Sequence, residues 1–294
     1  MEILKQCDPD GVQQRKRKRL RRRTYAVPGP DYLWHIDGYD KLKPYGFSIH
    51  GCIDGYSRRI IWMKIAPTNK NPELIASYYL KAVKELNGVP SKIRSDDGSE
   101  NSIIHPIHIA LRTAHRNEVD VLSSYLIGTS PANQRIESLW SQFTKDRIMF
   151  WRDFFSDLSE MELVDNSLPI TEECLRYCFI HLLRKDLNEF TERWNRHLIS
   201  KSKGAILPNG RPNSLYFLPH LYETQSYRKH VNYADIEEFS DPFLREETSD
   251  NAPEFVELAE TILTLNGLDT RKRETITDAL DLYVFLQSKI EEYC

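Results

Sequence analysis

The order of strand-like and helix-like segments between residues 33 and 94 is the feature that most limits the fold of this chain. Three segments rich in β-branched and aromatic residues follow one another closely, at residues 33–37, 47–53 and 59–65. Their composition and length are typical of β-strands. Turn-forming residues separate the second segment from the third, in Asp54-Gly55-Tyr56-Ser57. These segments therefore predict a three-stranded antiparallel meander.

A helix and a fourth strand follow the meander. Asn71 suits the N-cap position and Pro72 the first helical position. Apolar residues then keep helical spacing as far as Leu86, and Gly88 ends the helix. Residues 89–94 read as a strand. Three strands, a helix and a further strand predict an α/β fold.

The rest of the chain is mostly helical in pattern. We expect a helix over residues 101–116, a short fifth strand at 119–122, and a helix that begins at Ser130-Pro131 and runs to about Phe150. Apolar spacing also predicts a helix over residues 172–194.

Residues 204–219 are punctuated by Pro and Gly and are expected to be irregular, whereas the last 55 or so residues resemble acidic helices. The chain thus divides into a basic arm (1–24), an α/β core (25–150), a helical accessory region (151–232) and an acidic, helical C-terminal tail (233–294).

Charge is distributed very unevenly along the 294 residues. Residues 15–23 read RKRKRLRRR, with eight basic residues in nine. From residue 235 to the C-terminus there are sixteen acidic and five basic residues, a net charge of -11, although the whole chain carries only -3. The basic part suits a polyanionic partner and also resembles a nuclear localisation signal, so we expect the protein in the nucleus.

The composition excludes several other classes of protein. Hydrophobic residues make up 40% and charged residues 28%, which is ordinary for a globular protein. No apolar run approaches the roughly 20 residues that span a bilayer, so we expect no membrane partner. Five scattered cysteines are too few for a disulfide scaffold. No motif calls for a small-molecule cofactor.

Three acidic residues occupy positions where strand ends and a helix can bring them together. Asp37 lies in the first strand, Asp96 follows the fourth strand, and Glu137 lies one to two turns into the helix that begins at residue 130. Such a carboxylate cluster is what two-metal phosphoryl transfer requires. Mg²⁺ or Mn²⁺ prefers hard carboxylate oxygens, so these three residues are candidate metal ligands and catalytic residues.

The sequences around these acids resemble the three blocks of the integrase core with an Asp-Asp-Glu (DDE) triad, in the same order. The blocks are WHID at residues 34–37, RSDDGSEN at 94–101 and SPANQRIES at 130–138. The sequence DGYSR at 54–58 resembles the segment between the second and third strands of that core. The resemblance is strongest over residues 25–150 and points to integrase core proteins of transposon or retroelement origin.

The resemblance implies an RNase H-like five-stranded mixed sheet flanked by helices, followed by a mostly α-helical C-terminal region. It also implies a two-metal Mg²⁺ or Mn²⁺ site on Asp37, Asp96 and Glu137, DNA strand transfer, and self-association into a homo-oligomer. DNA is the expected partner. The candidate DNA-binding residues are basic and are Arg15, Lys16, Arg17, Lys18, Arg19, Arg21, Arg22, Arg23 and Arg135.

Some alternatives remain open at this point. Asp97 stands where retroviral cores carry Asn, so either it or Asp96 could be the ligand; the two-residue offset to Gly98 favours Asp96. Forty residues separate Asp96 from Glu137, a longer interval than in retroviral cores. The rival functions are a domesticated, non-catalytic DNA- or chromatin-binding protein and a plain RNase H-type nuclease.

Several other residues have plainer interpretations. Asp54 is favoured as a turn residue, and Glu100 as either a helix cap or a supporter of the metal site. One helix carries Cys174, Cys178 and His181, which we expect to pack in the core rather than bind metal. The aromatic residues Trp140, Phe143 and Phe150 are also expected in the core.

Overall fold

The computed structural model describes most of the chain. The described residues are 25–113, 121–128, 133–165, 168–200, 206–240, 243, 250–268 and 273–293. The basic residues of the arm, Arg15 to Arg23, lie outside this set, as do Ser130 and Pro131.

A five-stranded mixed sheet forms the centre of the fold. Its strands are β1 (Leu33–Tyr39), β2 (Ser48–Asp54), β3 (Ile60–Ala66), β4 (Lys92–Ser95) and β5 (Tyr125–Ile127), and their spatial order is β3-β2-β1-β4-β5. The first three strands pair antiparallel, whereas β4 runs parallel to both β1 and β5. The predicted RNase H-like sheet is confirmed.

The fifth strand lies later in the sequence than predicted. Of the predicted strand 119–122, only the last two residues are described, and Leu122 begins a 3₁₀ turn with 79% of its surface exposed. Tyr125 instead is buried, and its hydroxyl donates to Ser95 Oγ over 3.1 Å. β5 therefore begins where an aromatic side chain can be buried against β4 rather than at the apolar pair Val121-Leu122.

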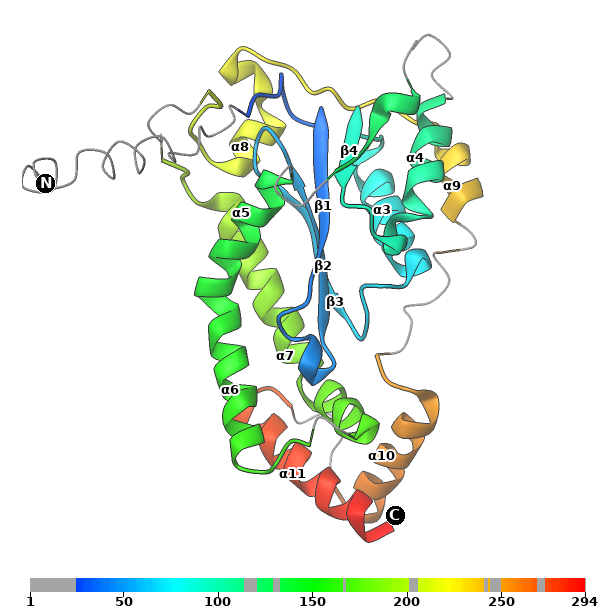
Figure 1. The fold of residues 1–294 in the computed structure, drawn as a ribbon, viewed down its shortest axis with the longest axis vertical. Coiled ribbons are helices and arrows are strands. Elements are labelled where there is room, and N and C mark those ends of the chain that lie inside the picture. The colour runs from blue at the N-terminus through cyan, green and yellow to red at the C-terminus, as the bar shows by residue number, and fades with distance from the viewer. Residues whose placement is uncertain are drawn as a thin grey trace, which may run out of the picture.

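Two hydrophobic cores occupy the two faces of the sheet, because successive strand residues point to opposite sides. On one face, Trp34 and Ile36 pack against α3 (Pro72–Leu86) and α4 (Ile104–Thr113). On the other face, Tyr39 packs against the helices that follow the sheet. Figure 1 shows α3, α4 and the short α9 (Tyr233–Ser240) on one side of the strands and α5 and α7 on the other.

The helices on the second face extend the molecule well beyond the sheet. One continuous helical rod is made by α5 (Gln134–Phe143), a π-helical turn (Thr144–Ile148) and α6 (Met149–Glu160). Beside it runs α7 (Pro169–Arg196), which packs on β3 and on α11 (Ile276–Tyr293). With α10 (Pro253–Leu265), these helices confirm the mostly helical C-terminal region (Figure 1).

Residues expected to be irregular contain a short helix. α8 (Pro212–Phe217) begins at a proline in its first position and buries Leu215 and Tyr216. The Tyr216 hydroxyl donates to Asp31 Oδ1 over 2.6 Å, which ties this segment to the entrance of β1. Burial of these two side chains outweighs the Pro and Gly signals that flank them.

None of the helices in the described ranges combines the length and apolarity that crossing a bilayer requires.

Candidate active site

The sheet and α5 bring the three predicted acidic residues to one region of the molecule. Asp37 lies in β1, and Asp96 directly follows β4, the parallel neighbour of β1. Glu137 lies in the first turn of α5, which packs on β1 and β2. The negative charges of Glu137 and Asp96 both act on the carboxyl group of Asp37.

Asp37 is the most perturbed of the three carboxyl groups. Burial raises its pKa from 3.8 to about 7; a hydrogen bond from Trp140 opposes the rise, and the charges of Glu137 and Asp96 add to it. Trp140 Nε1 donates to Asp37 Oδ2 over 2.9 Å. An ionised Asp37 is therefore costly until positive charge approaches it, which is the behaviour expected of a carboxylate that receives a cation.

Asp96 is held by the loop that follows β4. Its Oδ1 accepts the backbone N–H of Gly98 over 3.3 Å and the side-chain Nδ2 of Asn101 over 3.2 Å. Asp97 is exposed, whereas Asp96 is partly buried. Of these two residues, Asp96 contributes one of the main negative charges that act on Asp37. This favours Asp96 over Asp97 as the second acid.

A buried bridge fixes the start of α5 to β1. Asn133 Nδ2 donates to the Ile36 carbonyl over 2.9 Å, and Asn133 Oδ1 lies 2.6 Å from His35 Nδ1. Because the amide oxygen can only accept, His35 Nδ1 carries the proton and donates it. Asn133 and Trp140 thus connect α5 to β1 on either side of Glu137. Neither partner of this bridge is a local neighbour in sequence, and the only local signal was that Asn133 shares a helical face with Glu137.

Arg135, predicted to bind DNA, stacks on an aromatic ring. Its guanidinium lies 4.3 Å from the centroid of the Tyr25 ring. The Tyr25 hydroxyl donates to His35 Nε2 over 2.8 Å. The side chain of Arg135 is partly buried, and its Nε has no hydrogen-bond partner.

Glu100 forms an ion pair that the sequence did not reveal. Its side chain is only 4% exposed, and its Oε1 accepts from Lys70 Nζ over 2.9 Å. Gly98, not Glu100, precedes the 3₁₀ turn Ser99–Asn101. The interpretation of Asp54 as a turn residue is confirmed, because its Oδ2 accepts from both the backbone N–H and the hydroxyl of Ser57.

The remaining side chains singled out from the sequence lie mostly in the core. Cys174 and Cys178 are buried free thiols, and His181 Nε2 contacts the carbonyl of Arg273. Trp140 and Phe143 are buried as expected. Phe150 is different: 51% of its surface is exposed, because it lies on the outer face of α6.

The carboxylates interact but do not form a closed metal cage. Across the described residues, no group of three or more His, Cys, Asp or Glu side chains is arranged to hold a metal ion as it stands. The donor chemistry nevertheless fits a hard divalent cation, because Asp37, Asp96 and Glu137 offer carboxylate oxygens and Asp37 is destabilised when ionised.

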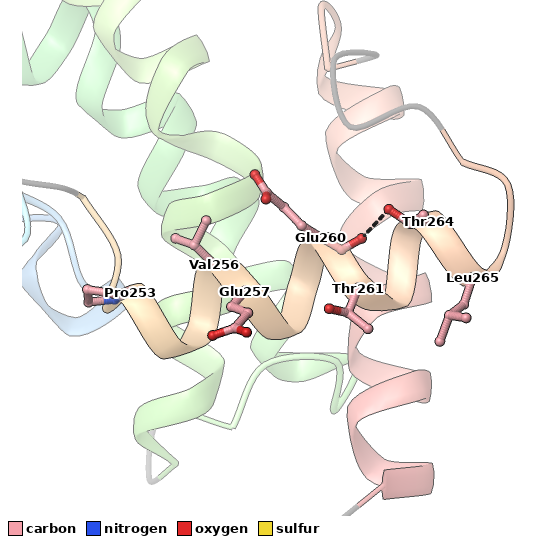
Figure 2. A pocket seen from close by; sticks show the side chains of 7 residues that line it. All are labelled: Pro253, Val256, Glu257, Glu260, Thr261, Thr264 and Leu265. Atoms are coloured by element: carbon pink, nitrogen blue, oxygen red, sulfur yellow. Dashed lines mark hydrogen bonds between the residues drawn. The ribbon is translucent and has the colours of Figure 1, made fainter.

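A shallow hollow on α10 is unrelated to these acids. Figure 2 shows the side chains that line it along one face of the helix, and they are Pro253, Val256, Glu257, Glu260, Thr261, Thr264 and Leu265. Asp37, Asp96 and Glu137 are not among its lining residues, so it is not the candidate active site.

The candidate site lies inside a segment that matches a known domain family. The family model for the integrase core domain matches the sequence over residues 24–226. This range includes the whole sheet, the three acids and helices α3 to α8. No curated protein matches the chain. Integrase core domains are generally polynucleotidyl transferases that use divalent metals and act on DNA.

Proposed function

Because the chain belongs to the integrase core domain family, we propose that it is a metal-dependent DNA recombinase that hydrolyses phosphodiesters and transfers strands during DNA integration. The observation that carries the proposal is the convergence of Asp37, Asp96 and Glu137, with a pKa of about 7 for Asp37. A structural role alone does not account for a partly buried carboxyl group whose ionisation is opposed by two further acidic residues.

Asp37, Asp96 and Glu137 would hold the divalent ions, Mg²⁺ or Mn²⁺. When bound, such ions activate water or a DNA 3′-hydroxyl for attack and neutralise the charge that develops on the phosphate. The same carboxylates serve hydrolysis and strand transfer, so no protein nucleophile is needed.

The surrounding side chains would hold these carboxylates in position. Trp140 orients Asp37 by donating to one carboxylate oxygen, and Asn101 does the same for Asp96. Asn133 holds the first turn of α5, and hence Glu137, against β1. Oriented partners of this kind typically contribute 10- to 100-fold to metal affinity or activity.

A domesticated, non-catalytic DNA- or chromatin-binding protein is the alternative. It is favoured by the lack of a closed metal cage among the described residues. The two functions differ in one measurable respect, because only the recombinase requires the metal for its DNA product.

The test is nicking and joining of labelled duplex DNA in Mn²⁺ or Mg²⁺. We expect a metal-dependent product from the wild-type chain and none from Asp96→Asn. Asp97→Asn is a matched control, since it removes the adjacent, exposed carboxylate and should retain activity. A folded, DNA-binding wild-type chain without product would favour the domesticated protein, and cleavage confined to RNA–DNA hybrids would indicate an RNase H-type nuclease.

Two further properties belong to the proposal. We propose nuclear localisation and DNA-backbone contact for the basic segment at residues 15–23, since eight of its nine residues are basic. Self-association is proposed because recombinases of this kind act as multimers. Sedimentation with and without DNA would test self-association, and removal of residues 15–23 would test localisation.

A further inference from the structure

Three arginines lie around the partly buried Tyr25 and the buried His35, next to the acidic residues. Arg58 lies in the turn between β2 and β3, Arg94 lies on β4, and Arg135 lies in the first turn of α5. All three are partly buried. They come from sequence positions far apart, so the fold itself gathers this positive charge.

Direct contacts connect these groups. The Arg135 guanidinium stacks on the Tyr25 ring, and Tyr25 donates to His35, which is paired in register with Arg94 across β1 and β4. A Cβ added to Gly55 would lie 2.2 Å from the Tyr25 hydroxyl, so the turn that carries Arg58 approaches this ring directly.

Arg58 is anchored at the same place. Its Nη2 donates to the carbonyl of Pro208 over 2.6 Å, and its backbone adopts a left-handed conformation with φ 63°. A left-handed conformation is uncommon for a side chain of this size. The surrounding contacts therefore hold this guanidinium at a defined position instead of leaving it free in solvent.

Asp54 is the acidic residue whose charge acts on both Arg58 and Arg135. Asp54 is fully buried, and its oxygens accept hydrogen bonds from the backbone of Asp31 and from Ser57. The positive charges also oppose one another, since burial and the charge of Arg135 lower the pKa of Arg58 to about 10. Partly buried cations in this state are stabilised by an anion.

We propose that Arg58 and Arg135 form a binding site for one backbone phosphate of the DNA strand that reacts at the acids. This inference rests on the proposed function. The Arg135 guanidinium lies over the Tyr25 ring and also hydrogen-bonds the Tyr25 side chain, whereas its Nε has no hydrogen-bond partner. A guanidinium fork binds phosphate oxygens in its own plane.

The position of the site agrees with a strand passing over the acids. His35 precedes Asp37 by two residues of β1, a distance of about 7 Å, and Asn133 precedes Glu137 by one turn of α5, a rise of about 6 Å. Arg135 itself lies two residues before Glu137 on α5, so the phosphate site is next to the acids.

The test measures how binding of a labelled DNA duplex depends on salt, with a chelator present so that no reaction occurs. The double variant Arg58→Gln, Arg135→Gln should bind more weakly and lower the slope of log affinity against log salt by about 0.9, the value for one phosphate. Arg184→Gln is the matched control, because Arg184 is an exposed arginine of α7 that pairs with Asp250 of the C-terminal region, away from Arg58. It should keep the wild-type slope.

A second variant separates charge from folding. Arg135→Lys keeps the positive charge, so its salt slope should equal that of the wild type even if its affinity falls. A lower slope for Arg135→Lys, or a wild-type slope for the double variant, would overturn the phosphate site. Failure of the wild-type chain to nick DNA that it binds would refute the proposed catalysis and leave this site standing, because the binding assay needs no reaction.

Discussion

Replacing Asp37 by Asn should stabilise the metal-free protein. Burial and neighbouring acids raise the pKa of Asp37 to about 7, so the folded chain binds a proton there more tightly than the unfolded chain does. The stability of the wild type therefore falls as pH rises from about 4 through 7. Asn cannot ionise, yet its carbonyl oxygen can still accept the hydrogen bond from Trp140.

The size of the effect follows from the two pKa values. A shift from 3.8 to about 7 corresponds to a cost of about 4 kcal/mol at pH 8 and about 2 kcal/mol at pH 5, at 1.36 kcal/mol per unit. Asp37→Asn should recover most of this cost at pH 8 and about half as much at pH 5.

Urea unfolding of both chains, with chelator at the two pH values, measures the difference directly. Adding Mn²⁺ should then stabilise the wild type by about 2.7 kcal/mol at 100 times its dissociation constant, and leave Asp37→Asn unchanged. A variant that is equally stable or less stable than the wild type at pH 8 would refute the reasoning, because it would show that the ionised carboxylate costs nothing in the fold.

Three further variants test the packing of the helical core and the charges around the site. Leu183→Ala removes a fully buried side chain of α7 and should cost about 2–5 kcal/mol in urea unfolding. Lys70→Gln removes the partner of buried Glu100 and should cost about 1–2 kcal/mol, which Glu100→Gln in the same chain should restore; a double variant no more stable than the single one would contradict this. Trp140→Phe removes the donor to Asp37 and should move the pH dependence of metal-dependent activity upward by about 1–2 units, and an unmoved profile would show that the bond does not control ionisation.

Local signals in the sequence predicted the elements best. The helix after the meander begins at Pro72 and ends at Leu86 as expected, and Asn71 Oδ1 accepts the backbone N–H of Glu73 over 2.9 Å. Such caps act over three or four residues, so they can be read from the sequence directly. The proximity of the three acids was predicted from their positions at strand ends and from the family blocks together.

Contacts between distant residues could not be predicted in this way. His35 and Asn133 are 98 positions apart, and Lys70 and Glu100 are 30 apart. Hydrophobic periodicity carries no information on which buried polar groups become partners. The fourth strand begins at Lys92 rather than at residue 89 for the same reason, because Val89 exchanges backbone hydrogen bonds with Lys229 instead.

The π-helical turn between α5 and α6 sets the rotational phase of two surfaces. A π-turn contains one residue more than an α-turn, and one residue corresponds to a rotation of about 100°. Upstream of it, Trp140 faces β1; downstream, Trp151 Nε1 donates to Asp186 of α7 over 2.8 Å. If all the residues of Thr144–Ile148 were α-helical instead, one of these surfaces would be turned about 100° away from its partner. The wide turn thus fixes the angle between the two ends of the rod. One end can then contact the acidic residues while the other packs against the C-terminal helices.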